Sequence, residues 1–160
     1  MARQTVCGFS VLAVALLLGT GAALAQSAAD IGAVTAANNA FYAAESALDM
    51  PSMEKVWAHE EYVALAGPRA MAPLIGWTAL QSYFARNFGN MAQFSLKPVD
   101  AHVRVNGDTA WVVGKEEIGN SSKLKDGTPI SSRPTIVTNI FEKHGERWLM
   151  VSHHAQEIPQ

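Results

Sequence analysis

Apolar residues recur every three or four positions between residues 34 and 48 of the chain. They are Val34, Ala37, Phe41, Ala44 and Leu48. This spacing places them on one side of an α-helix and predicts that this side is buried. The polar residues Asn38, Tyr42 and Glu45 follow the same spacing at the edge of the apolar stripe. A helix with a polar strip beside its buried strip can border a cavity, and this one is our first candidate for a cavity wall.

A second, shorter helix is expected after a corner in the chain. Asp49 and Pro51 precede the segment 52–58. An Asp side chain accepts hydrogen bonds from the free N–H groups of a helix start, and Pro suits the first turn. A short strand is expected next, around residues 62–65.

Glycine and proline residues predict an irregular segment over residues 67–76. A third helix then begins at Thr78, with Gln81 three residues later as its capping-box partner. Gly89 is expected to end this helix, because glycine adopts the left-handed backbone conformation found at many helix ends.

The second half of the chain predicts strands. Extended segments are expected at residues 91–105, 109–118, 134–142 and 147–156. Asn106-Gly107-Asp108 indicates a hairpin, because Asn and Gly tolerate the positive φ of a tight turn. Helices followed by antiparallel strands predict an α+β fold, in which three N-terminal helices pack against an antiparallel sheet.

Residues 1–25 predict a signal peptide. Arg3 is followed by an apolar run and then by the small residues of Ala23-Leu24-Ala25, a pattern that signal peptidase cleaves. The run is short for a membrane span and glycines interrupt it. We therefore expect an exported protein, periplasmic or secreted, without stable membrane anchoring after cleavage. Residues 26–36 would form a lead-in, flexible at first, and the start of the first helix.

Composition narrows the possible functions. The chain has 160 residues, with 12 Lys and Arg against 14 Asp and Glu. This balance does not favour a nucleic-acid partner or an anionic membrane surface. Cys7 is the only cysteine, and it would leave with the signal peptide. The mature chain would therefore have neither a disulfide nor a cysteine-based zinc site.

Four short motifs, taken in order, resemble one known family. They are Ala47-Leu48-Asp49 after the first helix, Val56-Trp57-Ala58-His59 before a strand, Gly76-Trp77 before the third helix, and the final strand over residues 147–155. Their order and spacing resemble the SnoaL-like branch of the nuclear transport factor 2 (NTF2) and ketosteroid isomerase superfamily. The resemblance covers residues 38–155, and we place the domain at residues 37–157.

This resemblance implies a cone, in which a strongly curved sheet wraps against the helices and encloses a pocket. It also implies pairing into dimers through the outer face of the sheet, as in many members of the superfamily. It leaves the function open, because the fold hosts isomerases, cyclases, dehydratases and plain binding or assembly domains.

The isomerase residues of that superfamily are not found at the matching positions. The donor tyrosine falls on Phe41, with Tyr42 one place away, and the base aspartate falls near Ala64 or Leu65. None of these side chains can take a proton from carbon. We therefore expect no steroid double-bond isomerisation.

Two histidines remain candidate catalytic bases. His59 adjoins Glu60 and Glu61, and it is either a polarised base or a residue whose charge suits the end of a helix. His153 is either a base on the pocket wall or a hydrogen-bonded structural histidine. Their spacing gives no ligand set for a metal, so we expect neither a metal nor a cofactor.

Strand alternation suggests which face each final-strand residue occupies. We expect His153 to share the interior face with Leu149, Val151 and Ala155. His154 would share the outer face with Trp148, Met150 and Ser152. With Thr135 and Val137, Trp148 and Met150 are the residues expected to form a dimer interface.

The expected pocket has both apolar and polar walls. Its candidate lining is Asn38, Tyr42, Trp57, His59, Trp77, Trp111 and His153. Pockets of this kind bind small, mostly apolar molecules. Three hypotheses remain open, namely a binding domain without defined catalysis, an isomerase, lyase or hydrolase with a pocket histidine as base, and a dimeric interaction module.

Overall fold

The computed structural model describes residues 19–130 and 133–159, with side chains from residue 28 onwards. Most of the expected signal peptide therefore lies outside the described residues. The helices are α1 (Gly19–Ala47), α2 (Met50–Val56) and α3 (Trp77–Asn90). The strands are β1 (Ala64–Ala66), β2 (Leu74–Ile75), β3 (Met91–Gln93), β4 (Leu96–Asn106), β5 (Thr109–Ile118), β6 (Lys123–Leu124), β7 (Thr135–His144) and β8 (Arg147–Glu157). The α+β fold expected from the sequence is confirmed.

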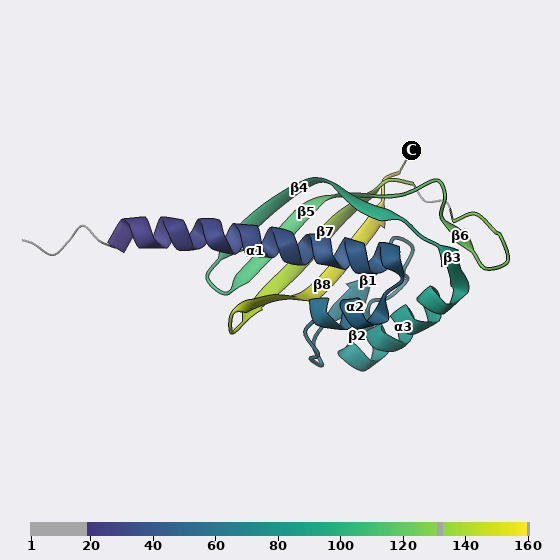
Figure 1. Ribbon diagram of the computed structural model, residues 1–160, viewed down its shortest axis with the longest axis horizontal. Helices are drawn as coiled ribbons and strands as arrows, with labels where there is room; N and C mark the ends of the chain where they lie inside the picture. The colour runs from purple at the N-terminus through teal and green to yellow at the C-terminus, as the bar shows by residue number, and fades with distance from the viewer. Residues whose placement is uncertain (1–18, 131–132, 160) are drawn as a thin grey trace, which may run out of the picture.

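A curved six-stranded sheet, in the order β2-β1-β8-β7-β5-β4, forms one layer, and β3 pairs separately with β6. Helix α1 lies across the four long strands, while α2 and α3 pack at one end (Figure 1). The sheet is mixed rather than purely antiparallel as expected, because β1 runs parallel to β8. No hairpin joins these two strands, so no tight turn imposes an antiparallel pairing. In the described part of the chain, none of the helices is both long and apolar enough to cross a membrane.

Two β-bulges bend the sheet around α1. One shifts the register of β4 against β5 between Val99 and His102, and the other shifts β7 against β8. At the first bulge, Gly114 faces the bulged backbone so closely that a Cβ atom would lie 2.9 Å from the carbonyl oxygens of Val99 and Asp100. A bulge adds a residue to one strand and bends it, which turns a flat sheet into a cone wall.

The second bulge places an extra residue, Val151, in β8. Met150 pairs with Phe141 and Ser152 with Ile140, so Val151 has no partner of its own. The alternation of faces shifts by one residue there. Trp148 and Met150 are therefore buried on the same side as His153 and Ala155.

The outer face expected for Trp148 and Met150 is thus wrong. Thr135 and Val137, the other residues expected at a dimer interface, are also buried, at 2% and 3% exposure. Strict alternation failed because a single inserted residue cannot be recognised from the sequence pattern alone.

Helix α1 begins earlier than the sequence suggested. It is continuous from Gly19, and the segment expected to be a flexible lead-in is helical, in keeping with the high helix propensity of its alanines. Asp30 fixes this part of the helix to the sheet. Its Oδ1 accepts hydrogen bonds from Lys143 Nζ (2.8 Å) and Trp148 Nε1 (3.2 Å).

The helix starts were predicted with mixed success. Asp49 caps α2, because its side chain accepts a hydrogen bond from the Ser52 N–H (3.3 Å). The capping box expected for α3 is absent. Gly76, with φ 86°, precedes the helix, and the Gln81 amide donates instead to Glu54 Oε1 (2.9 Å).

Candidate functional site

A cavity of about 210 Å³ lies between α1, α3 and the concave face of the sheet. Most of its wall is apolar. The apolar side chains include Phe41, Leu65, Phe84, Phe88, Leu96 and Ile118. The polar side chains of the wall include Glu45, Tyr83, Asn87, Glu116 and His153. A few polar groups on an apolar wall are typical of small-molecule sites.

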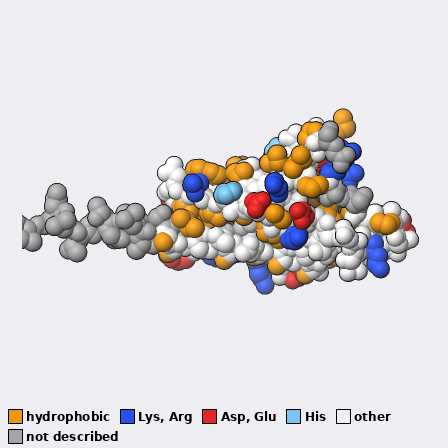
Figure 2. Space-filling model, turned by 90° about the horizontal axis from the view of Figure 1, so that it is seen from above, with side chains coloured by type: hydrophobic (Ala, Val, Ile, Leu, Met, Phe, Trp, Pro, Cys, Tyr) orange, Lys and Arg blue, Asp and Glu red, His pale blue; other side chains and the backbone are white. Residues whose placement is uncertain are grey.

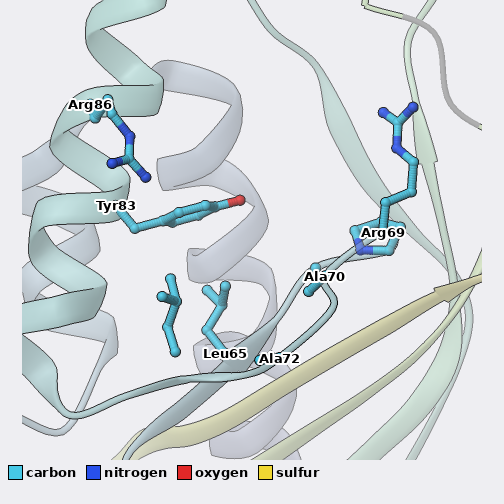
Figure 3. Close-up of a pocket in the computed structure, with 9 residues that line it drawn as sticks. Leu65, Arg69, Ala70, Ala72, Tyr83 and Arg86 are labelled. Carbon is cyan, nitrogen blue, oxygen red and sulfur yellow. The ribbon is translucent and has the colours of Figure 1, made fainter.

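The opening of this cavity is a wider pocket of about 410 Å³ beside the segment 67–76. Figure 3 shows Tyr83 extending from α3 across this opening, with Arg86 on one side of its ring and Leu65 on the other. Arg69 stands on the opposite side, where it forms an ion pair with Glu157 (3.5 Å). The irregular segment over residues 67–76 therefore borders the mouth of the cavity.

One polar cluster joins α1 to the sheet behind the cavity. Asn139 on β7 and His153 on β8 are cross-strand partners, and His153 Nδ1 donates to Asn139 Oδ1 (2.8 Å). Asn139 Nδ2 in turn donates to Asn38 Oδ1 (2.8 Å) and, more weakly, to the Tyr42 hydroxyl (3.4 Å). Asn38, Asn139 and His153 are all at least 94% buried. These contacts join α1 to β7 and β8 at the centre of the cone.

The same cluster sets the tautomer of His153. The amide oxygen of Asn139 can only accept a hydrogen bond, so Nδ1 of His153 carries the proton and Nε2 is left as an acceptor. Burial lowers the pKa of His153 to about 4, with a smaller contribution from the neighbouring His154. His153 is therefore a neutral hydrogen-bond acceptor on the cavity wall at pH 7.

A second polar cluster consists of two carboxyl groups. Glu45, in the last turn of α1, and Glu116, on β5, both line the cavity. Burial, followed by the charge of Glu116, raises the pKa of Glu45 to about 8. Burial also raises the pKa of Glu116, although hydrogen bonds from the Thr135 and Tyr42 side chains lower it in part.

One oxygen of Glu116 is unsatisfied. Glu116 is only 5% exposed, and its Oε2 has no hydrogen-bond partner among the described residues. Burial and the charge of Glu116 also raise the pKa of Tyr42, so its hydroxyl stays protonated and able to donate. A buried carboxyl oxygen without a partner is costly, which makes it a marker for a binding site.

The structure brings together only part of the predicted pocket lining. His153 lines the cavity, whereas Asn38 and Tyr42 lie behind the wall and position residues that line it. Trp57 is buried in the core, where its ring packs against those of Phe41 and Phe84. The distances between ring centres are 6.4 Å and 6.1 Å. Trp57 is therefore one ring removed from the cavity.

The other three predicted residues lie away from the cavity. His59 is exposed beyond the end of α2, where its Nε2 lies 2.8 Å from the Glu54 carbonyl oxygen and its ring stacks on Trp77 (4.3 Å). Trp111 is 38% exposed on the outer face of the sheet, because it alternates with the buried Ala110 and Val112 on β5. The prediction that His59, Trp77 and Trp111 line the pocket is therefore corrected, because none of them lines this cavity.

Sequence reasoning missed two central residues, Asn139 and Glu116. The pattern contained a signal for both, since each is a polar residue that shares its face of the strand with apolar neighbours. Glu116 follows Ala110 and Val112 at even spacing, and Asn139 lies between Val137 and Phe141. A polar side chain at such a position must find a partner or a ligand.

A metal centre finds no support in the described ranges 19–130 and 133–159. They contain no group of three or more His, Cys, Asp or Glu side chains placed to hold a metal ion. The polar side chains of the cavity wall offer hydrogen bonding, proton exchange and charge.

Comparisons with solved structures relate this fold to known proteins. A proposed dehydratase of the NTF2-like family from Streptomyces avermitilis is 26% identical, with a TM-score of 0.72 over 83% of this chain and 99% of that one. A proposed calcium/calmodulin-dependent protein kinase type II association domain from Thiobacillus denitrificans is 30% identical, with a TM-score of 0.65 over 78% and 94%.

A third structure shares the fold at lower identity. It is an NTF2-like superfamily protein from Salmonella enterica, 14% identical, with a TM-score of 0.73 over 83% of this chain and 94% of that one. A search of curated proteins finds no match. The sequence profile of the SnoaL-like domain matches residues 34–158, which is most of the chain. The protein therefore belongs to the SnoaL-like domain family, within the NTF2-like superfamily that its motifs resemble.

Proposed function

We propose that this protein is an exported binding domain that holds a small, mostly apolar molecule in the cone cavity. The observation that carries the proposal is the cavity itself, with an apolar wall and an acceptor nitrogen on His153. Its volume of about 210 Å³ favours one ring over the four fused rings of a steroid. For comparison, a cavity of about 150 Å³ in another protein accommodates benzene.

Calorimetric titration with toluene, benzyl alcohol and a steroid tests this proposal. Saturable binding of a single-ring compound is expected, with little or none of the steroid. Ile118→Trp should fill the cavity and abolish binding, because Ile118 lines it. Ile31→Trp is the matched control, since Ile31 is 40% exposed on α1 and does not line the cavity. Absence of binding to the well-folded parent protein would reject the proposal.

The alternative is an enzyme, and a lyase is the best candidate. The likeness to a proposed dehydratase supports it, as does a cluster of titratable groups whose pKa values burial displaces. With His59 outside the cavity, His153 is the remaining histidine base. Loss of water from a hydroxylated single-ring compound would appear as a new ultraviolet absorption. Turnover that disappears in His153→Gln would favour the enzyme over the binding domain.

Export is part of the proposal. The site after Ala23-Leu24-Ala25 supports cleavage before Gln26, which would leave α1 beginning at that residue. The intact mass of protein isolated from its own host should correspond to residues 26–160. A full-length mass would reject this part.

We also propose a dimer that pairs through the outer face of the sheet. Because Trp148, Met150, Thr135 and Val137 are buried, other residues must form this interface. Trp111, Val113 and Ile136 are exposed at 38%, 39% and 51%, and they lie on neighbouring strands. Figure 2 shows apolar side chains among charged ones on the face seen from above. Light scattering should give a dimer, and Val113→Glu should give a monomer. A parent protein that is monomeric at tens of micromolar would reject pairing.

A further inference from the structure

The two carboxyl groups of the cavity have an unusual relationship. Glu45 comes from α1 and Glu116 from β5, yet both line the same cavity. Burial and the charge of Glu116 both act on Glu45, and no hydrogen bond from a described residue offsets them. Glu116 Oε2 is buried and unpartnered. The pair therefore adds carboxyl oxygens to the cavity wall, and for Glu116 Oε2 no described residue supplies a donor.

Within residues 19–130 and 133–159, no Lys or Arg side chain pairs with either carboxyl group. Among the described residues that line the cavity, Arg69 is the only Lys or Arg. Its side chain is 74% exposed at the mouth, where it is already paired with Glu157. The inner wall is acidic, and a complementary cation would have to come from a ligand.

We propose that the cavity binds a small primary amine, with its apolar ring against the aromatic wall and its ammonium group between Glu45 and Glu116. This inference rests on the proposed binding function and names the class of ligand. An ammonium group has three N–H donors and no acceptor, which matches a site that offers several free acceptors. A hydroxyl group has a single donor and would leave oxygen atoms unsatisfied.

The other groups around the pair are compatible with a cation. Tyr83 on α3 has a raised pKa through burial and through the charge of Glu45, so it remains a neutral phenol. His153 is neutral because burial lowers its pKa to about 4. Tyr42 reaches Glu116 from behind the wall, and Arg86 lies at the outer pocket. None of these groups places a positive charge between the carboxylates.

Proton release gives this proposal a distinctive pH dependence. Glu45 has a pKa of about 8, so it is mostly protonated at pH 6 and must lose its proton to face an ammonium group. Affinity for the amine should therefore rise with pH from 6 to 8, by up to about tenfold per pH unit for one released proton. A ligand that accepts a hydrogen bond from the protonated acid, such as a ketone, would show the opposite trend.

Isothermal titration at pH 6 and pH 8 with benzylamine, benzyl alcohol and acetophenone tests the proposal. Benzylamine should bind at least about tenfold more tightly than benzyl alcohol at pH 8, because a charged hydrogen bond to a carboxylate is much stronger than a neutral one. Its affinity should fall at pH 6. Glu45→Gln and Glu116→Gln should each remove the preference for benzylamine while leaving benzyl alcohol bound.

Glu117→Gln is the matched control for both variants. Glu117 is the next residue on β5, is absent from the cavity wall and pairs with Lys97 (3.2 Å). Its replacement should leave both affinities unchanged. If circular dichroism shows that Glu116→Gln does not fold, the test rests on Glu45→Gln alone, since the Glu45 side chain is partly exposed and its replacement is milder.

The outcomes separate this inference from the function on which it rests. If benzyl alcohol binds as tightly as benzylamine, the amine proposal is wrong and the binding function stands. If acetophenone binds best and weakens as pH rises, the pair acts as a neutral donor and the amine proposal is again wrong. If none of the three compounds binds, both proposals fail.

Discussion

Two polar clusters border the same cavity, and they are built in opposite ways. In the cluster of Asn38, Asn139 and His153, hydrogen bonds of 2.8 Å link one residue to the next, and His153 Nε2 is left as an acceptor on the cavity wall. For the pair of Glu45 and Glu116 the described residues form no such chain, and among them Glu116 Oε2 has no partner. The first cluster stabilises the fold, whereas the second costs stability and leaves acceptors facing the cavity.

The difference teaches how to separate structural from functional polar groups. Both clusters are polar and lie between α1 and the sheet, and both would be candidate sites on their position alone. The balance of donors and acceptors distinguishes them, because hydrogen bonds link the members of the first cluster, whereas Glu116 Oε2 has no donor among the described residues. Their pH responses also differ in sign. Neutral His153 favours the folded state as pH rises from about 4 to 6.5, while Glu45 disfavours it from about 4.5 to 8.

The largest effect is expected from breaking the satisfied cluster. Asn139→Leu keeps the approximate size of the side chain but removes the partners of both Asn38 and His153. Leaving two buried polar groups unpaired should lower the free energy of unfolding by about 3 kcal/mol. Urea denaturation at pH 7 measures this. Thr138→Ala is the control, because Thr138 is the neighbour of Asn139 that faces outward. It should lower the free energy of unfolding far less. Equal effects of the two variants would contradict our account of this cluster.

A smaller effect of opposite sign is expected from the carboxyl pair. The folded-state pKa of Glu45 is raised, so its contribution to stability is fully present below about pH 4.5 and is lost as pH rises to 8. Glu45→Gln does not titrate and should be more stable than the parent at pH 8. We expect the free energy of unfolding to rise by about 2 kcal/mol. This is well below the free energy that corresponds to the whole pKa shift, because the side chain is partly exposed.

Urea denaturation of this variant at pH 5 and pH 8 makes the comparison. The gain should shrink at pH 5, where the parent carries a neutral Glu45. Glu117→Gln should show no gain at either pH, since Glu117 lies outside the cavity beside Lys97. A variant less stable than the parent at pH 8 would mean that Glu45 is charged and well paired.

The smallest effect is expected at the contact between the clusters. The Tyr42 hydroxyl receives a weak hydrogen bond from Asn139 (3.4 Å) and also bonds to Glu116. Tyr42→Phe should lower the free energy of unfolding by about 1 kcal/mol. It should also raise the pKa of Glu116, which loses a hydrogen bond that favours its charged form. Carbon NMR of the carboxyl groups reports this shift.

Tyr62→Phe is the control for this contact. Tyr62 is 53% exposed and donates to Glu142 (2.6 Å) far from the cavity. Its loss should leave the Glu116 titration unchanged. An unchanged titration in Tyr42→Phe as well would show that the two clusters are independent.

The sequence was enough to predict the fold but only part of the site. Helix periodicity gave the buried face of α1, including Val34, Phe41 and Ala44. It also placed Asn38 and Tyr42 at the edge of that face, where they meet the sheet. These predictions succeeded because helix geometry is local and regular.

The rest could not be predicted because it depends on pairing between distant segments. Asn139 and Glu116 matter through the residues opposite them, and register is set by the folded sheet rather than by either strand alone. His59 looked like a base beside Glu60 and Glu61, yet tertiary packing stacks it on Trp77 outside the cavity. Nothing in the local sequence distinguishes these outcomes.

The extra residue Val151 also has a consequence for how this family can change over time. Loss of the Val151 codon would restore regular alternation in β8, and Trp148, Met150, His153 and Ala155 would all stay on the inward face, because they would then lie an even number of positions apart. The strand would lose the bend that the bulge gives it. A one-residue gap between relatives at this point would therefore mark a flatter sheet behind the same inward residues.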